Sequence, residues 1–258
     1  MSFGVKDLFD IKGKVALISG AAGGLGTVAS KGLAEAGVKV MLNGRNEKTL
    51  KELADQIKQA GGVCDYCVGD PTKHEDVKNV VAATKKAFGG IDILIPIAGF
   101  NKPAPIIEQP LEEWQSIIAA NLKGTYLFCK EAGKVLVEQK RGGKVILISS
   151  TRSELGMANY TGYSPAKGAI NLLAKTLAAE WGPHKINVNA LAPTVFRTPL
   201  TEWMWGDAKV YENFLRRIPI GRLGEPEDFL GSLIFLSSKA SDFITGAILY
   251  ADGGYTAC

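Results

Sequence analysis

The sequence predicts an α/β fold, a single doubly wound parallel sheet of about seven strands with helices on both faces. The length of 258 residues, with 46% apolar and 22% charged residues, is typical of a globular domain. Short β-branched runs alternate with longer amphipathic stretches along the chain, and glycines mark the passages from helix to strand. This alternation indicates right-handed crossovers and a sheet buried between two helical layers. No linker or repeat divides the sequence, so we expect one domain over residues 1–258.

The expected strands are short and apolar, and most lead directly into a turn. They lie at residues 14–18, 38–42, 63–68, 91–95, 144–148, 186–191 and 247–250. The amphipathic patterns between them predict helices at residues 25–36, 47–60, 74–88, 122–138, 163–181 and 226–237. In open parallel sheets a ligand binds beyond the carboxyl ends of the strands, where the strand order reverses. Polar residues directly after a strand are therefore the candidates for function.

Charge and hydropathy exclude two classes of partner. The formal net charge is only +4, and its basic residues are scattered, which argues against nucleic-acid binding. No apolar run approaches the roughly 18 residues of a membrane span, and the first residues lack the apolar core of a signal peptide. We expect a soluble, cytoplasmic protein with no membrane or nucleic-acid partner.

The four cysteines predict neither disulfides nor a metal site. Cys64 and Cys67 form a CxxC pattern, but they fall within an expected strand, where residues three apart point to opposite faces. Cys129 and Cys258 are far from both in sequence. With only two histidines in the chain, we expect no bound metal.

A glycine-rich turn follows the first expected strand and opens a helix. It reads Ser19-Gly20-Ala21-Ala22-Gly23-Gly24-Leu25-Gly26. Glycines allow a tight turn and let backbone N–H groups approach a pyrophosphate at the positive end of the helix. The position predicts a phosphate-binding role, although such turns also serve only as connections.

The residues after the next strands bear on which dinucleotide binds. A site selective for NAD places a carboxylate after the second strand, whereas here Gly44 is followed by Arg45. A guanidinium suits a 2′-phosphate, so the sequence favours NADP(H) and leaves NAD(H) possible. Asp70 suits either an adenine amino group or a turn. Ala98 and Gly99 end the fourth expected strand, where small residues let backbone approach a cofactor.

Four polar residues form a candidate catalytic group. Tyr163 and Lys167 are spaced to share one helix face, and a nearby ammonium lowers the pKa of a phenol from about 10. Ser150 ends the fifth expected strand. Asn121 interrupts a helical pattern, either as a cap between two helices or as a polar group kept for a water chain.

These motifs, in this order, resemble the short-chain dehydrogenase/reductase family over essentially the whole chain. The resemblance rests on Gly20, Gly24 and Gly26, on Asn121, on Ser150 thirteen residues before Tyr163, on Lys167, and on the segments at 187–193, 222–226 and 252–254. It implies a Rossmann-like domain that binds a dinucleotide and often forms tetramers through two long helices and the last strand.

The resemblance also implies a role for each matching residue. Tyr163 exchanges the proton, Ser150 holds the substrate oxygen, Lys167 binds the nicotinamide ribose, and Asn121 anchors a relay water. Thr198 follows Pro193 at the distance expected of a contact with the carboxamide, and Ser19 keeps the hydroxyl of the family's usual threonine. Pro96 and Ile97 depart from the usual Asn-Asn, which removes a polar strut near the cofactor.

The substrate is the least determined part of this interpretation. Residues 194–216 are expected to cover it with aromatic side chains that include Trp203 and Trp205, while Arg152 and Glu154 could reach a polar or charged group. Residues 153–156 are similar to gluconate 5-dehydrogenases, but the overall pattern is equally similar to 3-oxoacyl-carrier-protein reductases. The leading hypothesis is an NADP(H)-dependent oxidoreductase that interconverts a ketone and a secondary alcohol. An NAD-dependent sugar-acid dehydrogenase and a non-catalytic dinucleotide-binding protein are the alternatives.

Overall fold

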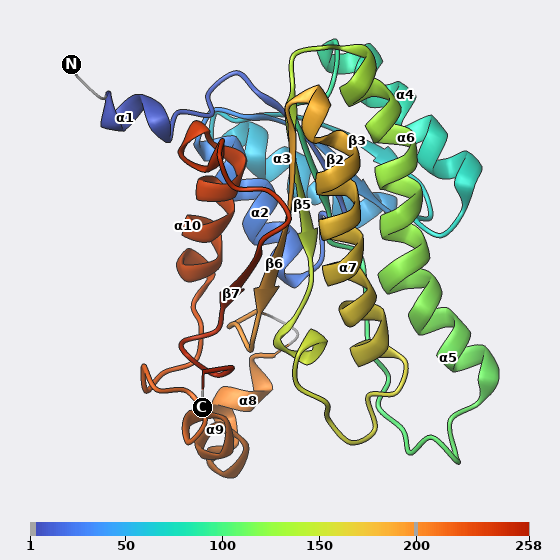
Figure 1. The fold of residues 1–258 in the computed structure, drawn as a ribbon, viewed down its shortest axis with the longest axis vertical. Helices are drawn as coiled ribbons and strands as arrows, with labels where there is room; N and C mark the ends of the chain where they lie inside the picture. The colour runs from blue at the N-terminus through green and yellow to red at the C-terminus, as the bar shows by residue number, and fades with distance from the viewer. Residues whose placement is uncertain (1–3, 199–200, 258) are drawn as a thin grey trace.

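Seven strands of the described residues form one parallel sheet in the order β3-β2-β1-β4-β5-β6-β7 (Figure 1). The structure is a computed structural model that describes residues 4–198 and 201–257, with the side chain of Trp203 outside that set. The predicted doubly wound sheet is confirmed. The strands are β1 (Val15–Ser19), β2 (Lys39–Gly44), β3 (Val63–Val68), β4 (Ile93–Pro96), β5 (Gly143–Ile148), β6 (Ile186–Pro193) and β7 (Ile248–Ala251).

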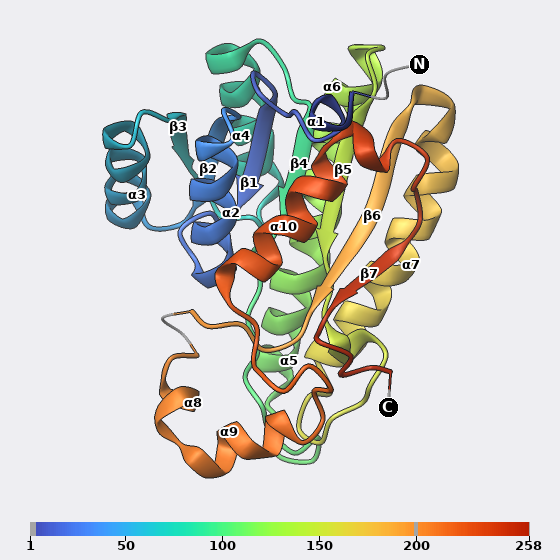
Figure 2. The same cartoon turned by 90° about the vertical axis from the view of Figure 1, so that its left-hand side faces the viewer.

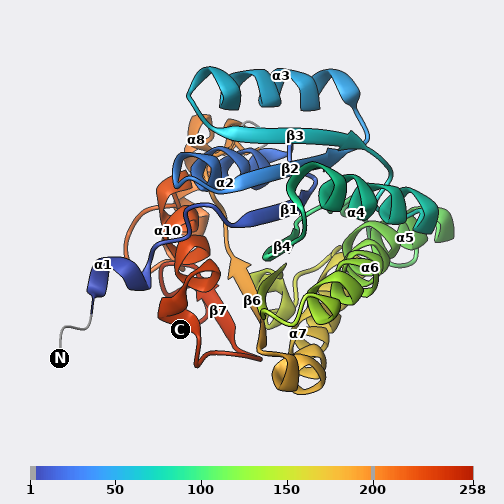
Figure 3. The same ribbon diagram turned by 90° about the horizontal axis from the view of Figure 1, so that it is seen from above.

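Helices cover both faces of the sheet, as Figure 3 shows from above. On one face α2, α3 and α10 pack in one apolar cluster, and on the other α4, α6 and α7 pack in a second. Every residue of β1 is buried, as expected for a parallel strand between two helical layers. The helices are α1 (Val5–Leu8), α2 (Gly24–Glu35), α3 (Glu47–Gln59), α4 (His74–Phe88), α5 (Leu111–Ile118), α6 (Gly124–Glu138), α7 (Tyr163–Trp181), α8 (Trp203–Gly206), α9 (Ala208–Leu215) and α10 (Pro226–Ser237).

The strand order reverses between β1 and β4. From β1 the chain proceeds outward to β2 and β3, then returns to place β4 on the other side of β1. The carboxyl ends of β1 and β4 therefore open the crevice that such a reversal creates. Figure 2 shows α8 and α9 beyond this same end of the sheet.

The helix before β5 is longer than the sequence predicts and contains an irregular turn. Helix α5 passes through a π-helical turn at Ala119–Lys123 into α6, whereas the hydrophobic pattern predicted only residues 122–138. Pro110 precedes the first turn of α5, a position that a proline tolerates. Asn121 therefore does not cap a boundary between two helices but lies inside the π turn.

The structure agrees with the expected separation of the CxxC thiols. Cys64 is buried in the cluster on one face of the sheet, and Cys67 packs against the cluster on the other. Both are free thiols, as is Cys129, and Cys258 lies outside the described residues.

No helix in the described part of the chain has the length and apolarity to cross a membrane.

Candidate active site

A crevice of about 690 Å³ lies at the carboxyl ends of the strands. Its walls come from the residues that follow β1, β2, β4, β5 and β6, together with the N-terminal turn of α7. Most of the candidate residues from the sequence line it: Gly20, Gly24, Leu25, Gly26, Arg45, Asp70, Ala98, Gly99, Asn121, Ser150, Arg152, Tyr163, Lys167, Pro193 and Thr198. The described residues of the expected covering segment contribute Val195, Phe196, Thr201, Met204 and Phe214. Because Asp70 follows β3, residues from six strand ends share one concave surface.

The glycine turn leaves the start of α2 open toward this crevice. Gly20 adopts a positive φ of 67°, and a Cβ there would come within 2.7 Å of the Ala98 Cα. A Cβ on Gly26 would come within 2.1 Å of the Gly20 carbonyl oxygen, so the helix packs directly on the turn. No side chain caps α2 and no acidic residue lies in its first turn. Its first N–H groups and positive dipole end therefore fit a phosphate.

The end of β2 is positively charged and carries no carboxylate. Exposed Arg45 lines the crevice beside Asp70. Burial opposes ionisation of Asp70, but hydrogen bonds from the Thr72 N–H at 2.9 Å and hydroxyl at 2.8 Å, with the charge of Arg45, outweigh it and lower its pKa. Asp70 thus forms the turn that the sequence allowed as one alternative, and it also faces the crevice. The surface after β2 suits an additional phosphate better than a ribose hydroxyl.

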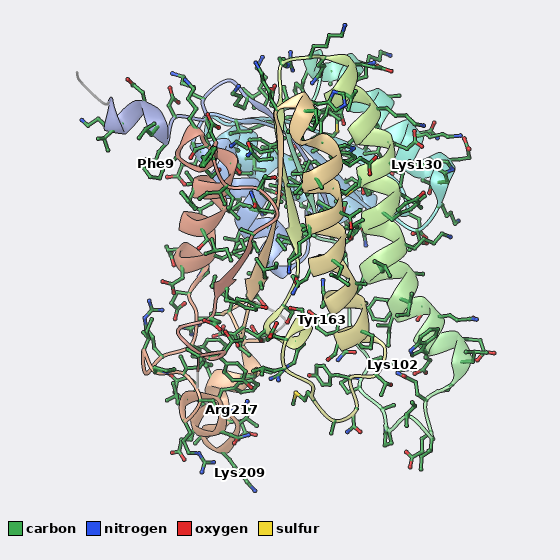
Figure 4. All side chains as sticks on the ribbon, in the orientation of Figure 1. Phe9, Lys102, Lys130, Tyr163, Lys209 and Arg217 are labelled. Carbon is green, nitrogen blue, oxygen red and sulfur yellow. The ribbon has the colours of Figure 1, made fainter. Side chains whose placement is uncertain are left out.

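Ser150, Tyr163 and Lys167 meet where β5 ends and α7 begins. The Ser150 hydroxyl is close enough to the Tyr163 phenol to favour its ionised form. The Lys167 Nζ lies 5.4 Å from the centre of the Tyr163 ring and donates a hydrogen bond of 2.8 Å to the Ile148 carbonyl. Tyr163 is the first residue of α7 and Lys167 lies one turn later, as the spacing predicts. Figure 4 shows Tyr163 at the lower end of α7.

Burial controls the ionisation of this pair. It raises the pKa of Tyr163, because dehydration disfavours the phenolate more than the Ser150 hydrogen bond and the Arg152 charge favour it. The same cause lowers the pKa of Lys167 to about 8. The lowering of the phenol pKa that we expected from the nearby ammonium is outweighed by burial, and the net shift of the Tyr163 pKa is upward. Tyr163 is instead held in the protonated form that a proton donor requires.

Asn121 connects the π turn to the residues after β4. Its Nδ2 donates to the carbonyl oxygens of Phe100, at 2.7 Å, and Ile117, at 2.9 Å. Its Oδ1 is buried and has no hydrogen-bond partner within residues 4–198 and 201–257. A Cβ on Gly99 would come within 2.3 Å of that oxygen, so glycine is needed for this approach. π-Helical turns often occur at functional sites, and this one brings an asparagine to the crevice.

Some candidates do not reach the crevice. Ser19 lies behind it and its Oγ accepts a hydrogen bond of 3.5 Å from the Ala98 N–H. Glu154 points elsewhere and accepts a hydrogen bond of 3.1 Å from the Tyr250 hydroxyl. Trp205 packs against Tyr211 and Arg197 and does not line the crevice. The side chain of Trp203 lies outside the described residues.

Sequence reasoning missed several further lining residues, among them Phe100, Asn101, Met157 and Tyr160. They lie in the irregular segments after β4 and before α7, where no periodic pattern marks an inward-facing position. The Asn101 Nδ2 is buried without a hydrogen-bond partner in the described part of the molecule. The spacing of Tyr160 from Tyr163 was a possible signal, since their rings contact edge to face at 6.1 Å.

Comparison with known proteins finds relatives that match nearly the whole chain. The family model described as enoyl-(acyl carrier protein) reductase matches residues 20–256. An uncharacterized oxidoreductase of Mycobacterium tuberculosis is 46% identical over 97% of this chain and 94% of that protein. The gluconate 5-dehydrogenase of Gluconobacter oxydans is 36% identical over 97% of both proteins.

A solved structure extends the agreement to the fold. The gluconate 5-dehydrogenase from Burkholderia cenocepacia, in complex with NADP and tartrate, superposes with a TM-score of 0.93. It is 34% identical and covers 98% of this chain and 99% of its own. The motifs, the seven-stranded sheet and the matched length together lead to one conclusion. The chain is an oxidoreductase and belongs to the short-chain dehydrogenase/reductase family.

Proposed function

We propose that the protein is an NADP(H)-dependent dehydrogenase/reductase that interconverts a ketone and a secondary alcohol on a polyhydroxy acid. The observation that carries the proposal is the meeting of Ser150, Tyr163 and Lys167 beside an uncapped helix start in one crevice. A non-catalytic dinucleotide-binding protein would not need a buried phenol and amine placed together, because each is costly to bury.

The chain's own side chains supply the proton and hold the reacting oxygen. In the reductive direction the Tyr163 hydroxyl gives its proton to the carbonyl oxygen, which the Ser150 hydroxyl also binds. Bound NADPH supplies the hydride to the carbonyl carbon, so the C=O bond becomes a secondary alcohol. Lys167 places a positive charge near the phenolate left behind, and we assign Asn121 to the path that returns a proton to it. Oxidation of the alcohol reverses each transfer.

The cofactor assignment follows from the two ends of the crevice. Gly20, Gly24, Leu25 and Gly26 would hold the pyrophosphate at the start of α2, and Arg45 the 2′-phosphate of NADP(H). Asp70, Ala98, Gly99, Pro193 and Thr198 would contact the rest of the dinucleotide, with Ser19 supporting Ala98 from behind. The absence of a carboxylate after β2 favours NADP(H), and NAD(H) remains usable because only the 2′ contact differs.

The substrate class is proposed from the polar lining and from the relatives. Buried Arg152 and the unpartnered amide of Asn101 offer donors to a charged and a hydroxylated ligand. Several relatives are named for gluconate chemistry, among them the 5-keto-D-gluconate 5-reductase of Escherichia coli, which is 34% identical over 97% of this chain. A sugar acid therefore fits better than an acyl chain.

The experiment that tests the function is NADPH consumption with ketones, repeated with Tyr163→Phe. We expect the variant to lose about 10³-fold in kcat, since it lacks the proton donor, while its Kd for NADPH, measured by fluorescence, stays unchanged. Tyr66→Phe removes a phenol hydroxyl on β3, away from the crevice, and is the matched control. Undiminished turnover by Tyr163→Phe would refute the assignment.

The proposal includes a homotetramer in the cytoplasm. The long helices α6 and α7 carry exposed apolar residues, Tyr126 and Leu172, and the outer edge of β7 is unpaired within the described residues. These features support contacts between copies of the chain, and the free thiols on Cys64, Cys67 and Cys129 suit a reducing compartment. Size-exclusion chromatography with light scattering tests the assembly, and a persistent monomer would contradict it.

A further inference from the structure

We propose that Arg152, held by Tyr255, binds the carboxylate of the substrate and makes the enzyme select acids over neutral ketones of the same shape. This inference rests on the proposed function and adds the residue that determines which ketones are accepted. The sequence suggested only that Arg152, just past Ser150, could reach a polar or charged group of the substrate.

The first observation is where Arg152 lies. It belongs to the 3₁₀ turn Thr151–Ser153 directly after Ser150, and its N–H donates to the Ser150 Oγ at 3.2 Å. Only 8% of the residue is exposed, and it lines the same crevice as Tyr163. Its charge also reaches the phenol, whose pKa it lowers against the larger effect of burial. The guanidinium is therefore near enough to Tyr163 for its charge to act on the phenol.

The second observation is that this buried cation has no anionic partner among the described residues. Within residues 4–198 and 201–257, no carboxylate comes within 4.0 Å of the Arg152 guanidinium. Glu154 accepts from Tyr250 instead. The Asp252 carboxylate is occupied by the N–H groups of Gly254 and Thr256 and by the Thr256 hydroxyl. Burying an unpaired charge is costly, so an anion from outside the chain would stabilise this site.

The third observation is that Arg152 is fixed in place. One of its terminal N–H groups donates to the Tyr255 hydroxyl at 2.8 Å, and its Cζ lies 5.3 Å from the centre of that ring. Tyr255 is 1% exposed and packs with Ile218 and Leu223. Arg217 covers the same ring, with its Cζ 4.5 Å from the centre. In Figure 4 Arg217 lies at the same lower end of the molecule as Tyr163.

This arrangement leaves donors available to a ligand. A guanidinium carries five N–H donors in a rigid fork, and the described residues accept only the one that points to Tyr255. The remaining donors match the two oxygens of a carboxylate. A phosphate would also fit this fork. The open start of α2 and Arg45 already serve the phosphates of the cofactor, whereas Arg152 is beside Ser150, where the ketone binds.

The unpartnered Asn101 amide supports a polar ligand in the same crevice. Its buried Nδ2 requires an acceptor, and a hydroxyl oxygen of a polyhydroxy acid would supply one. Apolar residues such as Phe100 and Met157 complete this part of the lining. A carboxylate at one position and hydroxyls at another describe a sugar acid rather than a simple ketone.

The test compares acids with their neutral counterparts under NADPH. One pair is 5-keto-D-gluconate and L-sorbose, which differ by a carboxylate in place of a CH₂OH group, and a panel of other keto acids is paired with their methyl esters. We expect the wild-type enzyme to favour the acid of its best pair in kcat/KM. In Arg152→Met the KM for that acid should rise about 30- to 100-fold, the loss expected when one partner of a buried charge pair is removed.

Three further measurements locate the effect. The KM for the neutral partner and the Kd for NADPH should stay the same in Arg152→Met, and Arg152→Lys should recover part of the affinity for the acid. Tyr255→Phe keeps the ring but removes the acceptor, so we expect a smaller rise in KM, about 3- to 10-fold. Arg141→Met, at an exposed arginine that pairs with Asp92 and does not line the crevice, is the matched control. Circular dichroism establishes that each variant is folded.

Each alternative outcome has a defined meaning. Equal use of acids and neutral partners by the wild type, or an unchanged preference in Arg152→Met, would overturn the carboxylate assignment and leave the ketone chemistry intact. A parallel loss of NADPH affinity would show that the guanidinium pairs with a cofactor phosphate. Failure of the wild type to consume NADPH with either kind of ketone would count against the proposed function itself.

Discussion

The two halves of the crevice are built by different means. The cofactor half is formed mainly by backbone: the turn after β1, the uncapped start of α2 and the close approach of Gly20 to Ala98. The substrate half is formed by side chains from segments far apart in sequence, as in the hydrogen bond between Arg152 and Tyr255, which lie 103 residues apart. The backbone geometry of the cofactor half depends on the positions of glycines and strands, which can be recognised in the sequence. Contacts between side chains that are far apart in the sequence can be recognised only in the folded structure.

The largest expected effect tests the backbone half. In Gly26→Ala the added Cβ would come within 2.1 Å of the Gly20 carbonyl oxygen, so the turn or the helix must shift. We expect NADPH affinity to fall at least about 10-fold, the equivalent of losing roughly one charge-assisted hydrogen bond to phosphate. Isothermal titration calorimetry measures the change.

A matched glycine separates packing from helix propensity. Gly231 lies within α10, and a Cβ added there would meet no atom within 4 Å among the described residues. Gly231→Ala should leave NADPH binding intact and stabilise the protein by up to about 1 kcal/mol. Normal NADPH affinity in Gly26→Ala would show that the close contact is not required.

The next largest effect concerns Arg45, a side chain of the cofactor half that we expect to determine the preference for NADPH over NADH. Arg45→Asp replaces a cation that suits a 2′-phosphate by an anion that suits a ribose hydroxyl. We expect the ratio of kcat/KM for NADPH to that for NADH to fall by about 10- to 100-fold. Lys48→Asp makes the same charge change on an exposed residue of α3 that does not line the crevice, and should alter the ratio far less. An unchanged preference in Arg45→Asp would remove Arg45 from the site.

A titration examines the substrate half directly. Burial raises the pKa of Tyr163 in the protein without cofactor, so its phenol should ionise above the usual value of about 10. The difference in phenolate absorbance between wild type and Tyr163→Phe reports this titration. Because the Arg152 charge favours the phenolate, Arg152→Met should raise the pKa further. A phenol that ionises below its usual value would contradict the structure.

The smallest expected effect is on stability, and it concerns the ion pair that links the end of the substrate-covering segment to α10. Arg222, which follows that segment, binds Asp228 at the start of α10 through two hydrogen bonds of 2.5 and 2.8 Å. This hydrogen bonding is the main reason why the pKa of Asp228 falls to about 2. Both side chains are substantially exposed, so we expect Asp228→Asn to cost less than about 1 kcal/mol, or roughly 2–4 °C in Tm.

The pH dependence of that effect has a definite sign. An acid whose pKa is lower in the folded state contributes stability above its unfolded value of 3.8, and this contribution is lost as the pH falls through about 2. The Tm difference between wild type and Asp228→Asn should therefore be similar at pH 7 and pH 5. Glu227→Gln, at the neighbouring exposed position, is the control. A Tm difference that disappears by pH 5 would show that the ion pair is not responsible.

Some elements could be predicted from the sequence better than others, because a local pattern is visible in the sequence and a contact between distant segments is not. The bounds of α4, α7 and α10 match the hydrophobic pattern because each has one face against the core. The glycines and the Tyr163–Lys167 spacing predicted residues that the structure brings together in one crevice. The sequence pattern missed α5 because only Ile117 of its residues is buried, which leaves no apolar stripe to detect. Glu154 was misplaced because its direction depends on Tyr250, on another strand.

The π turn at Ala119–Lys123 has a consequence for how the molecule could change. A π turn accommodates one residue more than regular helix, and each residue of an α-helix rotates the next by about 100°. Deleting one amino acid from the π turn would therefore rotate α5 about the helix axis by about 100° relative to α6. Ile117 would turn away from Gly162, which it now faces, and the loop leading back to β4 would be redirected. The one additional residue of the π turn thus determines which face of α5 is directed toward the rest of the enzyme.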